Sequence, residues 1–547
     1  MVSVQKDGRG LEPHHGGFDH RFHFARASIH RRRCKAACAT VPHRLTSAGN
    51  EVTPFSKSAF TRCGGGCGVF RLSPHDAGRS SIMKKVLAGL ASLAVAAATA
   101  TVGLADTLPA RDRPNILLIT ADDLGMQLSC YGDRNIATPH LDKLASSGVR
   151  FTRAYVTQPS CSPSRSSMFT GLYPSQTGHL GLSHYGFGIQ QGIPNLTVTL
   201  RNAGFRTALI GKLHVGPAKS FAFDLAEGGF DTATPWPKDA ENTRDVEQVG
   251  KTLGDFITKA PGPFFVKLSL LDPHGPFSPT VKGYPQKPIT ADDMKSLQPP
   301  FKDTDEGRKE AAAYYNCIKR LDDGVGIITT VLKDKGVEKN TLVIFVSDNG
   351  LPFPKGKCTL YEGGTRVPLM ISWPGHVKAD IVNNNLVSTV DLVPTILEYV
   401  GLPMYKGNNR VYEGRSLKRL LEGEQVPGFR QYLFTEMTFH RPMDLNIRRA
   451  ATDGRYKLIR GYGPQAGVEL YDLEKDPNET DNLAVTPGAE EHLRRLDGEL
   501  TRFLERVQDP VLSPEKVRAW EQISAKARAE EPKTKRDLVR PTKAGNP

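Results

Sequence analysis

Four runs of apolar residues, each about as long as one β-strand, most constrain how this chain can fold. They cover residues 115–120, 205–210, 263–270 and 341–346, and they are continuous rather than alternating in hydrophobicity. A strand that is buried on both faces has this pattern, which is typical of parallel sheets covered by helices. The longest amphipathic helix is expected at residues 310–335. The sequence therefore predicts an α/β fold, in which sites lie at the carboxyl ends of the strands.

Acidic residues follow the first and the last of these runs. Asp122 and Asp123 come just after the first run, and Asp348 and Asn349 come just after the last. Adjacent carboxylates repel each other, so on a surface they would point into solvent. At the ends of buried strands they are better placed to hold a hard cation, and oxygen ligands suit Ca²⁺, or less well Mg²⁺. The sequence offers no matching set of histidines for zinc.

The segment Cys161-Ser-Pro-Ser-Arg165 is typical of a helix start, with Pro163 in the first turn and Thr170-Gly171 at the end. Cys161 would lie at the helix N-terminus, where free N–H groups favour negative charge. Arg165, one turn further on, would point back to the same place. This arrangement fits attack on an anionic ester. The alternative is a buried thiol near a helix start, which is the commoner state of a single cysteine.

Basic residues mark three further segments. Lys212 and His214 follow the second apolar run and project to the same side of an extended segment. His274 lies between two prolines after the third run and suits a general acid, although a turn histidine has the same pattern. Lys355 and Lys357 precede a Tyr-Glu-Gly-Gly segment, and Lys355 is expected to face solvent.

The pattern Cys-x-Pro-Ser-Arg followed by Thr-Gly resembles the signature of type I sulfatases, and the other motifs follow in that family's order from about residue 114 to 483. The resemblance implies an alkaline-phosphatase-like α/β/α sandwich with a smaller C-terminal α+β subdomain. It also implies that a formylglycine-generating enzyme converts Cys161 to formylglycine. The family's motifs imply one Ca²⁺ held by Asp122, Asp123, Asp348, Asn349 and the modified Cys161. They also imply sulfate contacts from Arg165, Lys212, Lys357 and His274. His214 would contact the formylglycine hydrate.

Several stretches look most like the heparan N-sulfatase branch of this family. They are residues 160–165, 210–217, 272–274 and 347–354. The chain departs from that branch at two places. Lys357 stands where the branch has arginine, and the Glu-Gly-Gly that follows it is absent from the branch. Pro442-Met443-Asp444 stands where the branch has Pro-Met-Arg. His440, Arg448 and Arg449 are nearby candidates for substrate contact.

The predicted function is hydrolysis of sulfate esters or sulfamates, in sulfated glycans such as those with heparan-type N-sulfoglucosamine. One alternative is a phosphonate or phosphate ester hydrolase of the same fold, because such relatives also use formylglycine. The other is a non-catalytic protein that binds sulfated glycans and keeps an unmodified cysteine at position 161.

The first 105 residues differ in composition from the rest. Residues 1–82 have no sustained apolar period and are expected to be a disordered, non-native upstream extension. Residues 83–105 begin with Met-Lys-Lys and continue as an uncharged Ala/Leu/Val run, which predicts a signal peptide, export to the periplasm or medium, and no stable membrane span after cleavage. An uncleaved signal anchor is the alternative. Most of the formal net charge of +14 lies here, and only +4 remains from residue 106 on, so nucleic acid is not an expected partner.

Three further boundaries are expected. A catalytic domain would cover residues 106–405, and a subdomain of short strands with a helix at 487–507 would cover residues 406–507. Residues 508–547 are rich in proline and charge, which predicts a flexible tail.

Overall fold

The computed structural model describes residues 113–531, apart from residues 228–243, 260–261, 295–296, 298 and 407–408. All of the described residues belong to one compact unit, Ala96–Pro547. The predicted upstream extension and signal peptide lie outside the described residues. Within the described part of the chain, no helix is both long and apolar enough to cross a membrane.

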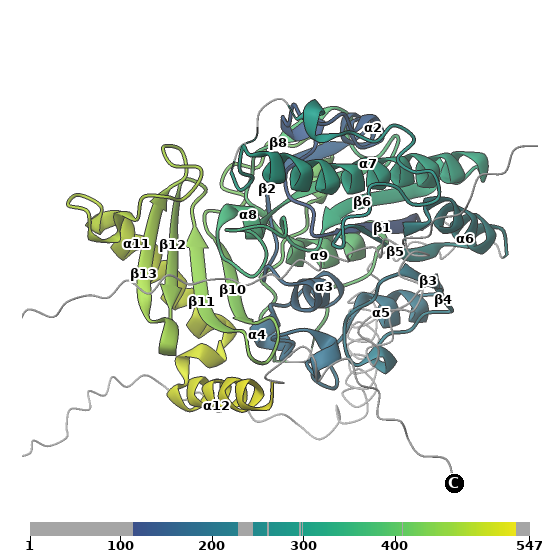
Figure 1. The fold of residues 1–547 in the computed structure, drawn as a ribbon. Helices are drawn as coiled ribbons and strands as arrows, with labels where there is room; N and C mark the ends of the chain where they lie inside the picture. Colours follow the sequence, from purple (N-terminus) through teal and green to yellow (C-terminus); the bar gives the residue numbers. More distant parts are fainter. Residues whose placement is uncertain are drawn as a thin grey trace, which may run out of the picture. The chain divides into compact units, whose positions relative to one another are not determined.

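A nine-stranded sheet organises the larger part of the molecule (Figure 1). Its strands are β1 (Asn115–Asp122), β2 (Val149–Tyr155), β3 (Arg206–Gly211), β4 (Leu225–Glu227), β5 (Phe264–Pro273), β6 (Thr341–Ser347), β7 (Arg366–Ser372), β8 (Ile381–Asn383) and β9 (Val387–Ser388). The order is β4-β3-β5-β1-β6-β7-β2-β8, and β9 pairs with β2. The four predicted runs form β1, β3, β5 and β6, which are parallel neighbours, so their carboxyl ends meet at one edge.

Helices cover both faces of this sheet, as the α/β/α prediction requires. Ile116 and Leu118 of β1 pack in one core, and Leu117 and Ile119 pack in a second core on the other face, which explains why the run is continuously apolar. The first core includes residues of α3 (Cys161–Thr170), α5 (Leu196–Asn202) and α9 (Leu392–Tyr399), and the second includes residues of α2 (Pro139–Ser146), α6 (Val246–Thr258) and α7 (Asp305–Asp334). Short helices α4 (Pro174–Thr177), α8 (Glu362–Thr365) and α10 (Lys418–Leu421) lie in the connections.

The long helix α7 begins five residues before its predicted start. Thr304 stands at the N-cap position, and its hydroxyl accepts a hydrogen bond from the backbone N–H of Gly307 (3.2 Å). This cap satisfies one of the donors left free in a first turn, so the helix extends beyond its apolar stripe.

A second, antiparallel sheet carries the C-terminal part of the chain. It consists of β10 (Leu433–Phe439), β11 (Leu445–Thr452), β12 (Tyr456–Gly461) and β13 (Gly467–Asp472), paired in that order. Helix α11 (Glu490–Val507) packs on it through Leu496, Leu500 and Phe503. This is the small α+β subdomain that the resemblance implied.

The prediction of a flexible tail from residue 508 is wrong for residues 510–530. Pro514–Glu530 forms helix α12, and Ser513 caps it by accepting a hydrogen bond from the backbone N–H of Lys516. Trp520 is 6 % exposed in the C-terminal core, and Ser524 donates to the carbonyl of Met443 (3.2 Å). A charge-rich composition fits a helix with a single buried stripe as well as a disordered tail, and here one tryptophan anchors the helix.

Candidate active site

Polar side chains from distant parts of the sequence meet at the carboxyl edge of the large sheet. Asp122, Asp123, Asp348 and Asn349 are each at most 2 % exposed. Asn349 Nδ2 donates to Asp123 Oδ1 (2.8 Å), and the backbone N–H of Asp123 donates to Asp348 Oδ1 (3.2 Å). The two acidic pairs predicted from the strand ends therefore form one buried cluster.

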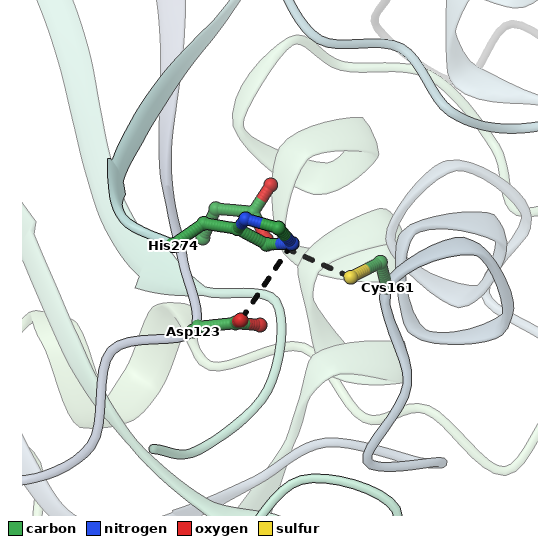
Figure 2. Close-up of side chains that lie close together, drawn as sticks. Asp123, Cys161 and His274 are labelled. Carbon is green, nitrogen blue, oxygen red and sulfur yellow. Dashed lines mark hydrogen bonds and ion pairs between the residues drawn. The ribbon is translucent and has the colours of Figure 1, made fainter. Parts of the chain in front are cut away.

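Helix α3 brings Cys161 to this cluster. The helix begins at Cys161 and is followed by Gly171 at φ 72°, a left-handed conformation that glycine adopts without steric cost. The thiol is buried and lies 3.6 Å from Asp122 Oδ1. Ligand atoms of Asp122, Asp123, Cys161 and His274 all lie within 4.8 Å of one another. Figure 2 shows the tip of the His274 imidazole directed toward the Asp123 carboxylate, with the Cys161 thiol nearby.

Arg165 is fully buried beneath this cluster, and protein groups take up its donors. Its Nε donates to Asp348 Oδ2 (2.7 Å), and its Nη2 donates to Asp122 Oδ2 (3.3 Å). Its Nη1 donates to the carbonyl of Lys212 (3.2 Å) and to Ser269 Oγ (3.1 Å). The expected direct contact of Arg165 with an anion is therefore not what this geometry shows. The guanidinium instead orients two carboxylates of the cluster.

Two lysines add further positive charge beside the acids. Lys212 Nζ lies 2.5 Å from Asp122 Oδ2, and Lys357 Nζ lies 2.6 Å from Asp123 Oδ1. Burial alone would lower the pKa of each ammonium, but Asp122 raises the pKa of Lys212 and Asp123 raises that of Lys357 well above its usual range. Both lysines therefore stay charged. Lys355 is exposed and donates to the carbonyls of Asn478 and Glu479, away from the cluster.

The acids of the cluster differ in their affinity for protons. Burial raises the pKa of Asp122, but Lys212 and other neighbouring cations reverse this and hold the pKa well below its usual range. For Asp348, burial and the charge of Asp122 outweigh Arg165, so its pKa is raised. Asn349 Oδ1 is buried and has no hydrogen-bond partner among the described residues. An unpartnered buried acceptor beside acidic oxygens is a feature of a cation site.

His274 is held by the turn that follows β5. Its Nδ1 donates to the carbonyl of Gly275 (2.6 Å), which directs Nε2 toward Asp123 Oδ2 at 3.8 Å. Arg244 donates from Nη2 to the carbonyl of His274 and so fixes the same turn. Burial is the main cause that lowers the pKa of His274, which makes the imidazole a ready proton donor once it is protonated.

His214 has a partner that sequence reasoning missed. Its Nε2 lies 2.9 Å from Nδ1 of His184, a residue in the 3₁₀ turn Ser183–Tyr185. No pattern in the sequence singles out His184, because its turn lies in a loop without a recognisable motif and 30 residues before His214.

Of the three candidates for substrate contact near residue 440, only His440 lies beside Cys161. His440 Nδ1 lies 3.0 Å from Ser160 Oγ, directly before Cys161, and burial and the charge of Lys357 hold its pKa well below its usual range. His440 thus belongs to the site. Arg448 instead pairs with Glu469 and Arg449 with Asp509, so the prediction that these two arginines contact substrate is not supported by their positions.

The chain matches two family models. One, described as Sulfatase, covers residues 114–402, and the other, described as N-sulphoglucosamine sulphohydrolase, C-terminal, covers residues 355–506. Human N-sulphoglucosamine sulphohydrolase is 34 % identical over 480 residues, which span 74 % of this chain and 93 % of that protein. An ulvan-active sulfatase of Formosa agariphila is 29 % identical over 440 residues, spanning 74 % of this chain and 82 % of the relative.

Solved structures share the fold. A protein in complex with its substrate D-glucosamine-2-N,6-O-disulfate superposes with a TM-score of 0.59 at 19 % identity, covering 73 % of this chain and 98 % of that one. A phosphonate monoester hydrolase of Agrobacterium radiobacter gives a TM-score of 0.59 at 23 % identity, covering 73 % and 97 %. The predicted alkaline-phosphatase-like fold is confirmed. The Sulfatase family model matches more than half of this chain, and the chain aligns with 93 % of the human relative. The chain therefore belongs to the sulfatase family and is a sulfuric ester hydrolase.

Proposed function

We propose that this sulfatase removes sulfate from sulfated glycans of the heparan type, with N-sulfoglucosamine as the substrate group, by using formylglycine at position 161 and one Ca²⁺. The observation that carries the proposal is the position of Cys161, whose Sγ lies 3.6 Å from Asp122 in a buried cluster of acids and lysines. The subtype is supported by the similarity to human N-sulphoglucosamine sulphohydrolase along nearly its whole length and by the matching C-terminal family model.

The residues present fit a hard cation. Asp122, Asp123 and Asp348 supply carboxylate oxygens, and Asn349 supplies the buried Oδ1 that has no partner in the described structure. A thiol and an imidazole among acids would also suit Zn²⁺, but conversion of Cys161 to formylglycine replaces sulfur with oxygen and favours Ca²⁺. Bound there, Ca²⁺ would supply positive charge that draws sulfate oxygens to the site and makes an oxygen nucleophile stronger.

The unmodified Cys161 side chain is a weak nucleophile. Burial raises the pKa of its thiol, and the nearby Lys212 and Lys357 do not overcome this effect. At neutral pH the thiol therefore keeps its proton, although the thiolate is the reactive form. A hydrated aldehyde at this position would supply two hydroxyl groups, of which one can attack and the other can give up a proton.

The remaining side chains fit complementary roles. Lys212 and Lys357 stay charged and bind the sulfate oxygens, on which negative charge grows during the reaction. His274 donates a proton to the leaving oxygen or nitrogen, and His214 accepts a proton from residue 161. Arg165 acts from beneath by holding Asp122 and Asp348 in place.

The side chains around His440, which we call the rim of the site, fit contacts with a sugar substrate. His440 lies at this rim, and the following turn is held by the ion pair of Arg441 and Asp444 (2.6 Å). Both side chains of this pair are partly exposed and offer donors and acceptors for hydroxyl groups. Lys357 and Asp444, which depart from the heparan N-sulfatase pattern, both lie where they would alter contacts with the substrate.

Maturation and location are part of the proposal. Formylglycine requires a formylglycine-generating enzyme as a partner, and the predicted signal peptide at residues 83–105 would export the protein to the periplasm or medium. Amino-terminal sequencing of the protein secreted by its native host would test this, because cleavage predicts a start near Asp106.

The decisive experiment combines mass spectrometry with two assays on protein from its native host. The tryptic peptide 154–165 should be about 18 Da lighter than its cysteine form. Sulfate should be released from N-sulfoglucosamine, and more slowly from 6-O-sulfated glucosamine. Faster hydrolysis of a phosphonate monoester would favour the phosphonate hydrolase alternative, which shares the fold. An unmodified peptide with glycan binding but no release would favour a binding protein.

A further inference from the structure

We propose that His184 is a positioning residue, which fixes the orientation and the protonated nitrogen of His214. This inference rests on the proposed function, in which His214 accepts a proton inside the site. The 3₁₀ turn Ser183–Tyr185 would thus be part of the machinery rather than a simple connection.

The contact between the two imidazoles is direct and well aligned. Nδ1 of His184 lies 2.9 Å from Nε2 of His214, which is a hydrogen-bond distance. The two rings are nearly parallel, with an interplanar angle of 13° and centroids 5.1 Å apart. Because a neutral imidazole has one donor and one acceptor nitrogen, this bond couples the tautomers of the two rings: whichever ring donates, the other must accept.

The second ring nitrogen of His214, Nδ1, is the atom whose role depends on this bond. His214 is 8 % exposed, and its Nδ1 is buried without a hydrogen-bond partner in the described structure. If Nε2 carries the proton and donates it to His184, Nδ1 has a free lone pair and can accept a proton. In the opposite tautomer, a buried N–H would lack an acceptor and His214 could not serve as a base.

Burial and the neighbouring cations favour neutral rings. Burial and Lys212 lower the pKa of both imidazoles, and Arg165 also lowers that of His214, whereas Asp122 raises it. Burial and the cations together hold the pKa of both histidines below the usual range. A neutral His214 needs a partner to select its tautomer, and His184 is the group that contacts Nε2.

His184 is itself held in place by its surroundings. The ring of Tyr185 packs against it with centroids 4.4 Å apart. The backbone N–H of Leu182 donates to the carbonyl of His440 (3.0 Å), which ties this turn to the rim of the site. His214 has φ 51°, a conformation that non-glycine residues rarely adopt, so its ring is also constrained by its backbone.

Three variants test the proposal. His184→Ala removes the acceptor, whereas His184→Gln keeps one, because the Gln Oε1 atom can accept the same proton. His492→Ala is the matched control, since His492 also packs against a tyrosine ring, that of Tyr456, but in the C-terminal subdomain. Thermal unfolding of all three establishes that they remain folded.

The first readout needs no turnover. Long-range ¹⁵N–¹H NMR spectra of histidine-labelled protein should show the proton of His214 on Nε2 in the wild type and in His184→Gln. In His184→Ala the two tautomers should mix. A wild-type His214 with its proton on Nδ1 would overturn the proposal. If the NMR result is as expected but the protein has no sulfatase activity, the pairing of His184 with His214 stands and only the proposed function is overturned.

The second readout is kinetic. His184→Ala should lower kcat by about tenfold to 100-fold with little change in KM, as for other residues that orient a functional group from behind. His184→Gln should recover most of this loss, and His492→Ala should match the wild type. A rise in KM with unchanged kcat would instead identify His184 as a substrate contact. A His184→Gln variant as slow as His184→Ala would also contradict the proposal.

Discussion

Two buried charge clusters lie at the same edge of the large sheet, and they differ in how completely their atoms are paired. The loop cluster consists of Asp272 with Arg320 and Arg244 at the end of β5. Both oxygens of Asp272 are matched by a single planar guanidinium, since Arg320 Nε and Nη2 lie 2.7 and 2.8 Å from them. Arg320 Nη1 donates in addition to the carbonyl of Ser278 (3.0 Å). The carboxylate of Asp272 is thus fully paired, although Arg244 Nε, 3.3 Å from Asp272 Oδ1, makes no hydrogen bond among the described residues. The cluster holds the turn that carries His274.

The site cluster is assembled differently. We use this name for Asp122, Asp123, Asp348 and Asn349 with Arg165, Lys212 and Lys357. Its acids are opposed by two flexible lysines as well as one arginine, and Asn349 Oδ1 is left without a partner in the described residues. A planar fork matches a carboxylate completely, whereas lysines are point charges that can turn to an incoming anion. One arginine thus pairs both oxygens of Asp272, whereas the site cluster keeps a buried amide oxygen open to a ligand, as the proposed function requires.

The largest effect is expected from Asp123→Asn in the site cluster. Asparagine has the same shape and tolerates the left-handed backbone of this position (φ 65°), so the fold should persist. The loss of a charged cation ligand should lower kcat/KM by at least about 10³-fold and abolish any rise in Tm on adding Ca²⁺. Enzyme kinetics and thermal unfolding with and without Ca²⁺ measure both. Activity within tenfold of the wild type would place the cation elsewhere.

The next effect is on stability and concerns the loop cluster. Asp272→Asn leaves the buried Arg320 without its carboxylate, which should reduce the free energy of unfolding by about 3–5 kcal/mol. Asp303→Asn is the control, because Asp303 pairs with Arg308 at the surface and is 54 % exposed, so its loss should cost less than about 1 kcal/mol. Urea denaturation measures both variants. Equal stabilities would show that the carboxylate of Asp272 is not paired as described.

The third prediction concerns Glu436, a buried acid beside an ion pair that is already complete. Glu436 lies near the pair of Arg449 and Asp509, and burial, opposed by Arg449, raises its pKa to about 7. The folded state therefore binds a proton that the unfolded state releases above its ordinary pKa of 4.5. The free energy of unfolding should fall as pH rises from about 4.5 to 7, by about 3 kcal/mol from this group. Urea denaturation at several pH values should show a weaker decline for Glu436→Gln, and an unchanged slope would contradict this assignment.

The smallest effect compares two lysines that stand two residues apart. Lys357→Ala should lower kcat/KM by about 10²-fold, or about 2.7 kcal/mol, because it removes a buried charge that pairs with Asp123 and that we propose binds the sulfate. Lys355→Ala should change it by less than about twofold, since Lys355 contacts only backbone carbonyls at the surface and the ring of Tyr361. Steady-state kinetics on N-sulfoglucosamine measure both. A larger loss for Lys355→Ala would reverse the assignment of the two lysines.

Much of the fold and most of the site follow from local patterns. Continuous apolar runs of strand length favour buried strands, and acids directly after such runs are expected to gather where parallel strands end. Asp122, Asp123, Asp348 and Asn349 were predicted in this way, and Pro163 and Gly171 indicated the limits of the helix that carries Cys161. The helix predicted at residues 487–507 is α11, which begins three residues later.

Contacts between distant side chains that do not both follow a predicted strand were not predictable in this way. Local sequence accounts for the strands, the helix at Cys161 and the chemistry at each strand end, because these depend on neighbours a few residues away. The packing of the folded chain was needed to show that Arg165 donates to Asp122 and Asp348, that His184 contacts His214, and that Trp520 anchors helix α12. The physical reason is that hydrogen bonds and burial depend on which surfaces pack together, and spacing along the chain carries no information about that.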